Sequence, residues 1–120
     1  MSKTTVVIGA TPNSDRYAYR ATLNLQQHGH KVYPVGIHAG KIGSLDIITD
    51  KPEIKDVDTV TLYVGPANQV HWMDYILSLK PKRLVFNPGT ENKVSFEKAT
   101  AAGIECIEAC TLVMLSIGNY

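Results

Sequence analysis

The fold of this chain is decided by residues 6–15, which read Val-Val-Ile-Gly-Ala-Thr-Pro-Asn-Ser-Asp. A short, uninterrupted β-branched run is typical of a strand that is buried on both faces of a parallel sheet. The glycine that ends the run, and the turn-forming and capping residues after it, predict a tight loop that leads into a helix. The segment therefore indicates a strand, a loop and a helix, which is the first half of a βαβ unit.

The rest of the chain repeats this alternation of strand and helix. Helices are expected over 16–28, 66–79, 91–102 and 112–117, and the second of these is expected to turn Val70, Met73 and Leu77 inward. Strands are expected over 31–36, with Pro34 marking the exit, and over 58–64, 82–86 and 104–107. The glycines of 37–51 suggest a loop, in which 46–48 would form a short edge strand. We predict one Rossmann-like α/β domain over residues 1–120, with three layers and a mostly parallel sheet of about five strands.

Composition and charge exclude several classes of partner. The 120 residues carry 12 basic and 11 acidic side chains, a net charge of +1, so neither nucleic acid nor a membrane surface is an expected partner. No apolar run approaches the roughly 18 residues that span a bilayer. The only two cysteines are Cys106 and Cys110, and the N-terminal residues do not resemble a signal peptide. We therefore expect a cytoplasmic protein with reduced thiols.

The candidate ligand site lies at the carboxyl edge of the predicted sheet. Ligands of open parallel sheets bind outside the carboxyl ends of the strands, which here means the loops 9–15, 35–43, 64–68 and 87–91. Gly9 would let the backbone approach a ligand, and the following helix would direct its N–H groups toward a phosphate. Thr11 and Ser14 would add hydroxyl donors, although capping of the helix by Ser14 or Asp15 explains these side chains equally well.

Other motifs are absent or ambiguous. In the dinucleotide fingerprint G-x-G-x-x-G, the second and third glycines are replaced by Thr11 and Ser14, and no acidic residue ends the second strand. The histidines and cysteines have no spacing typical of a metal site, so neither a metal nor a catalytic residue is predicted. Cys106 is expected in the core and Cys110 near the ligand edge. Trp72 and Tyr75 fit either ordinary packing or an exposed patch for self-association, so a homo-oligomer stays possible.

A series of short motifs runs along the chain in a characteristic order, at residues 7–13, 16–18, 28–35, 40–43, 57–60, 86–92 and 102–104, with Cys110 near the end. In this order the motifs resemble those of the small stand-alone CoA-binding domain proteins, and the resemblance covers nearly the whole chain. The same domain type forms the N-terminal part of the succinyl-CoA synthetase alpha subunit. The chain departs from these relatives at 36–38, directly after the second strand, and at 108–110, where many relatives have an arginine before the cysteine.

The resemblance implies a site for coenzyme A or an acyl-CoA. Gly9, Ala10, Thr11 and Ser14 would surround the pyrophosphate, and Pro12 and Arg16 would also contact the cofactor. By the same resemblance Val35 and Lys41 would lie along the 3′-phosphate, Val64, Gly65 and Pro66 would flank the adenine, and Pro88 and Gly89 would border the pantetheine exit.

Three functions remain open from the sequence. The first is non-catalytic binding of coenzyme A or an acyl-CoA, which the resemblance and the loop after the first strand favour. The second is a small NAD(P)-dependent redox protein, against which the missing glycines weigh. The third is an interaction protein that has kept the fold without a ligand, which the altered loop after the second strand would permit.

Overall fold

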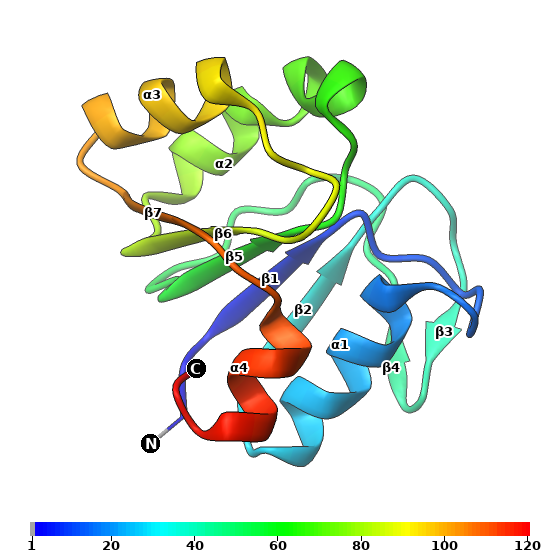
Figure 1. The fold of residues 1–120 in the computed structure, drawn as a ribbon. Helices are drawn as coiled ribbons and strands as arrows, with labels where there is room; N and C mark the ends of the chain where they lie inside the picture. Colours follow the sequence, from blue (N-terminus) through cyan, green and yellow to red (C-terminus); the bar gives the residue numbers. More distant parts are fainter. Residues whose placement is uncertain (1) are drawn as a thin grey trace.

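The computed structural model describes residues 2–120 and contains a five-stranded parallel sheet of order β2-β1-β5-β6-β7. These strands are β1 (Thr5–Ile8), β2 (Val32–Val35), β5 (Thr59–Leu62), β6 (Arg83–Phe86) and β7 (Glu105–Glu108). Helices α1 (Tyr17–Gln27) and α4 (Thr111–Ile117) cover one face, and α2 (Met73–Leu79) and α3 (Lys93–Ala101) cover the other (Figure 1). The predicted three-layer, Rossmann-like α/β domain is confirmed. In the described part of the chain, no helix is long and apolar enough to cross a bilayer.

The order of the strands determines where the loops after β1 and β5 diverge toward opposite faces of the sheet. β1 lies between β2 and β5, and the chain leaves β1 toward α1 on one face but leaves β5 toward α2 on the other (Figure 1). This is the switch point of a doubly wound sheet with the order 2-1-3-4-5, beside which such folds bind their ligands.

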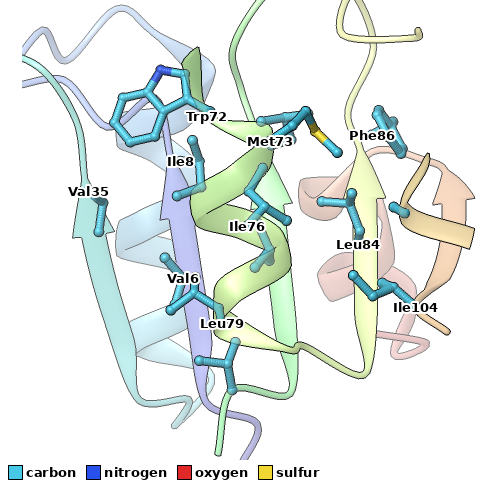
Figure 2. Close-up of a cluster of buried hydrophobic side chains, with 14 of the residues drawn as sticks. Val6, Ile8, Val35, Trp72, Met73, Ile76, Leu79, Leu84, Phe86 and Ile104 are labelled. Carbon is cyan, nitrogen blue, oxygen red and sulfur yellow. The ribbon is translucent and has the colours of Figure 1, made fainter. Parts of the chain in front are cut away.

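Alternate residues of the strands build two cores, one on each face of the sheet. Val6 and Ile8 of β1 pack with α2 in a cluster that also includes Trp72, Met73 and Ile76 (Figure 2). Val7 faces the opposite side and packs with residues of α1 and α4, among them Ala18, Leu25 and Leu115. Burial of both faces explains why residues 6–8 of β1 form an unbroken apolar run rather than an alternating pattern.

The predicted helix 66–79 consists of two helices. A 3₁₀ helix, η1, spans Pro66–His71, and α2 follows from Met73. Val70 is 73% exposed, so the prediction that it turns inward is wrong. A 3₁₀ helix has about three residues per turn, which brings Gln69 and Trp72 to the inner face instead. Met73 is buried and Leu77 half-buried, as predicted.

Trp72 and Tyr75 are packed residues, so the exposed-patch interpretation is wrong. Trp72 is only 6% exposed and lies in the α2-side core. The two rings meet edge to face with centroids 6.3 Å apart. The Tyr75 hydroxyl donates a hydrogen bond to the carbonyl of Pro52 at 2.6 Å.

Strand β2 continues through Pro34 to Val35, so Pro34 does not mark its exit. The Pro34 carbonyl accepts the N–H of Ile48 on the outer side of the sheet, at 2.9 Å, and the nitrogen of Pro34 faces the same way. A missing donor is tolerated there because β2 is an edge strand. The loop after β2 contains a hairpin, β3 (Lys41–Ile42) and β4 (Leu45–Asp46), and the edge strand expected over 46–48 is reduced to a bridge between Ile48 and Val35.

Two glycines allow backbones to meet at the carboxyl edge of the sheet. A Cβ atom on Gly9 would lie 2.8 Å from the carbonyl oxygen of Tyr63, and one on Gly36 would lie 2.2 Å from that of Ala10. Gly9 also has φ +95°, whereas Gly36 has no positive φ. The loops after β1, β2 and β5 therefore touch through main-chain atoms, which no larger residue would permit.

Gly36→Ala should destabilise the protein through this contact alone, because alanine can adopt the backbone conformation. We expect the free energy of unfolding to fall by roughly 1–3 kcal/mol, the usual cost of overpacking. The matched control is Gly65→Ala, since nothing lies within 4 Å of a Cβ at that glycine. Urea denaturation of both variants measures the difference, and equal stabilities would contradict the account.

Candidate functional site

The backbone of the first loop is anchored to the end of β2. The N–H groups of Gly9 and Ala10 both donate to the carbonyl of Val35, at 2.9 and 3.0 Å. Val35 is itself wholly buried, so its side chain packs in the core. Its carbonyl holds the start of the loop beside the switch point.

The loop leads into α1 without a side-chain cap. Arg16 is the N-cap residue, and no side chain accepts a hydrogen bond from the first turn. The interpretation of Ser14 or Asp15 as the cap is therefore wrong. Asn13 instead accepts the N–H of Asp15 at 3.0 Å, which closes a local turn. The helix thus begins with N–H groups that are not used by a capping side chain and that favour an anion.

Gln69 ties together the loops after β5 and β6. The side chain is wholly buried, and its Nε2 donates to the carbonyls of Val64 at 2.9 Å and Thr90 at 2.6 Å. Gly65, in the loop after β5, is the N-cap residue of η1 and has φ −61°. Gln69 therefore sets the separation of the two loops. The sequence did not predict this role, because the expected helix placed Val70 rather than Gln69 on its inner face.

A buried network of polar side chains holds the start of the loop after β6 in place. Asn87 donates through Nδ2 to the Thr61 hydroxyl at 2.7 Å and accepts the N–H of Thr111 through Oδ1 at 2.9 Å. The hydroxyls of Thr61 and Thr111 share a further hydrogen bond of 2.7 Å. The ends of β5 and β6 are thereby connected to the start of α4. Buried networks whose members are satisfied in this way are rigid, so the loop after β6 begins from a fixed point.

A cavity of about 860 Å³ opens among these loops, within the size range of cofactor sites. The loops after β1, β2, β5 and β6 contribute to its wall, together with Thr49 and Lys51. Of the residues expected at the site, the cavity is lined by Gly9, Ala10, Thr11, Arg16, Val64, Gly65, Pro88 and Gly89. The structure therefore brings together the core of the expected set.

The structure places the other expected residues outside the lining. Val35 is buried, Ser14 and Pro66 are exposed, and Pro12 lies against Gly40. Lys41 is in the hairpin, where its Nζ forms a salt bridge of 2.9 Å with Asp46. Both side chains of this pair are well exposed to solvent.

Several lining residues were not predicted. Ile37 and His38 come from the loop after β2, Lys51 from the segment before β5, and His71 and Trp72 from the end of η1. A sequence signal existed only for the first two, which lie in one of the loops at the carboxyl edge. Lys51 has no such signal, because long-range contacts bring its segment to the cavity.

The charge of the lining is one-sided. Arg16 and Lys51 are its permanent cations, His38 and His71 also line it, and no aspartate or glutamate is found there among residues 2–120. Neither cation forms a salt bridge within this described part of the chain. The Tyr63 hydroxyl adds no negative charge, since tyrosine is neutral near pH 7 and burial raises its pKa further. Such a cavity favours an anionic ligand.

The two cysteines lie outside the cavity lining. Cys106 is half-buried against the α2-side core, and burial raises the pKa of its thiol. Cys110 is the half-buried N-cap residue of α4 and lies at the carboxyl end of the sheet. Cys106, predicted to lie in the core, thus packs against the core but is only partly buried.

Comparison with known proteins gives a family and several structural neighbours. The model of a family described as "CoA binding domain" matches residues 3–116. The crystal structure of an uncharacterized protein is 51% identical, covers 100% of this chain and 99% of its own, and has a TM-score of 0.97. A hypothetical protein from Pyrococcus horikoshii OT3 is 23% identical over 97% of this chain and 83% of its own, with a TM-score of 0.84, and shares the fold. Among curated proteins, no match was found.

Gln69→Leu tests whether the hydrogen bonds of the Gln69 side chain hold the loops after β5 and β6 together. Leucine has a similar size but leaves the carbonyls of Val64 and Thr90 without their donor, so we expect a loss of about 1–3 kcal/mol in the free energy of unfolding. Gln27→Leu, at an exposed position at the end of α1, is the control and should change stability by less than about 0.5 kcal/mol. Urea denaturation measures the stability of both variants. An unchanged stability of Gln69→Leu would show that these hydrogen bonds do not hold the two loops together.

Proposed function

The chain belongs to the CoA-binding domain family, and we propose that it binds coenzyme A or an acyl-CoA in the cavity at the carboxyl edge of the sheet. The observation that carries this proposal is the positive charge of the cavity lining. Among the described residues, 2–120, the lining includes the cations Arg16 and Lys51 but no aspartate or glutamate. Coenzyme A carries a pyrophosphate and a 3′-phosphate. A net charge of +1 gives little attraction from the protein as a whole, so local cations would supply it.

The loop after β1 would hold the pyrophosphate. Gly9 and Ala10 line the cavity, Thr11 adds a hydroxyl, and the first turn of α1 has no side-chain cap to compete with a phosphate. Arg16 stands at the start of this helix and would pair with the phosphate oxygens, for which a guanidinium is well shaped.

The loops after β5 and β6 would hold the rest of the molecule. Val64 and Gly65 would flank the adenine, and Pro88 and Gly89 would border the pantetheine. Gly89 has φ +92° and no atom within 4 Å of a potential Cβ, so the wall is open there. When bound, the cofactor supplies a thiol that carries acyl groups as thioesters.

We propose a carrier or sensor of the cofactor rather than an enzyme that transforms it. Neither cysteine lines the cavity, and neither does a carboxylate, within the part of the chain that the structure describes. The Glu91 carboxylate lies just outside the lining, where its Oε1 accepts the N–H of Gly89 at 2.8 Å, so it is engaged by the backbone rather than free to act as a base.

Calorimetric titration with coenzyme A, acetyl-CoA and NAD, run in parallel at moderate salt, tests the proposal. Saturable binding of a CoA species without binding of NAD is the expected result. Binding should weaken as salt is raised, because ionic contacts are screened. Binding of NAD alone would favour the redox alternative, and no binding of any of the three would favour an interaction protein.

Gly65→Leu locates the binding site. Gly65 has an ordinary φ and open space around its potential Cβ, so the leucine should fold normally while it fills part of the cavity. We expect the affinity for coenzyme A to fall by roughly tenfold or more through steric exclusion. Ala67→Leu, exposed on the same 3₁₀ helix and outside the lining, is the matched control. Equal affinities of the two variants would place the ligand elsewhere. Gly9 is less suitable for this test, because a Cβ there would strike the Tyr63 carbonyl.

A further inference from the structure

We propose that Lys51, rather than Lys41, binds the 3′-phosphate of the cofactor. This inference rests on the proposed function and assigns one chemical group of the ligand, a dianionic phosphomonoester, to one side chain. The resemblance to relatives implied Lys41 for this role, whereas the structure places a different lysine in the cavity wall.

Lys51 is held in a defined position by its backbone conformation and by two side-chain interactions. Its backbone has φ +49°, a left-handed conformation that is costly for a residue other than glycine and is enriched at functional sites. Its Nζ donates to the carbonyl of His71 at 2.6 Å and lies 4.7 Å from the centre of the Trp72 ring. Trp72 is anchored in the core (Figure 2). The ammonium therefore rests on a rigid support.

The ammonium keeps capacity for an anion in this position. It has three N–H donors, of which the carbonyl of His71 takes one. No carboxylate contacts it within residues 2–120. An anion would therefore meet a charge that is already oriented, and little side-chain entropy would be lost on binding.

The position of Lys51 matches the proposed orientation of the cofactor. Lys51 bonds to His71 at the far end of η1, and η1 lines the same side of the cavity from Gly65, where the adenine would lie, to His71. Arg16 and the start of α1 would hold the pyrophosphate. In coenzyme A the 3′-phosphate is attached to the ribose that carries the adenine, so the cation near the adenine is the one expected to meet it.

Lys41 is poorly placed for the same role. Its Nζ is 2.9 Å from a carboxylate oxygen of Asp46 in the hairpin, and neither residue lines the cavity. A phosphate near Lys41 would also approach the negative charge of Asp46, which would reduce the attraction.

The test compares coenzyme A with 3′-dephospho-coenzyme A in calorimetric titrations. The wild-type protein should prefer coenzyme A by roughly 10- to 100-fold, the range for a hydrogen bond to a charged group. Lys51→Met keeps the apolar part of the side chain over Trp72 but removes the charge. It should lose most of this preference while its affinity for the dephospho compound stays within about twofold of wild type. Lys51→Gln is a second variant, and thermal unfolding checks that both are folded.

Lys55→Met is the matched control, because Lys55 is exposed, lies on the same segment and is outside the lining. It should keep the full preference for coenzyme A. Loss of the preference in Lys41→Met but not in Lys51→Met would overturn the assignment. Equal binding of both compounds by the wild type, or equal weakening of both by Lys51→Met, would also overturn it and leave the proposed function intact. No binding of either compound by the wild type would instead refute the proposed function.

Discussion

The close approach of three backbone segments at the switch point is the constraint on which the rest of the structure depends. Gly9 and Ala10 share the carbonyl of Val35 as their acceptor, and a side chain on Gly9 or Gly36 would collide with a neighbouring carbonyl. The loops after β1, β2 and β5 are consequently fixed against one another by main-chain atoms. Because the chain then diverges to opposite faces of the sheet, a cavity opens beside this fixed point.

The cavity concentrates charge that the molecule as a whole lacks. Net charge is only +1, so long-range attraction of an anion is weak. Arg16 and Lys51 approach the cavity from different parts of the chain, and each is free of carboxylate partners in the described residues. Recognition would thus rest on a few oriented groups supported by buried hydrogen bonds such as those of Gln69 and Asn87.

The sequence predicted the architecture well because the strands are short apolar runs separated by helices and turn residues, and this local pattern suffices for a parallel sheet. It predicted the loops of the cavity for the same reason, since the carboxyl ends of parallel strands lie along one edge. It did not predict Lys51, whose position depends on contacts with His71 and Trp72, about 20 residues away along the chain. Nor did it predict the inward turn of Gln69, because helical periodicity assumes 3.6 residues per turn and η1 is a 3₁₀ helix.

The proposed occupancy of the carboxyl-edge cavity by coenzyme A can be mapped by an NMR titration of the ¹⁵N-labelled protein with coenzyme A. If the cofactor binds there, the largest amide shifts should occur in the loops after β1, β5 and β6, at Gly9, Thr11, Gly65 and Gly89, and at Lys51. Amides of the groove beside β2, such as those of Lys31 and Tyr33, should change little. Shifts concentrated in that groove, or the absence of shifts at saturating ligand, would contradict the account.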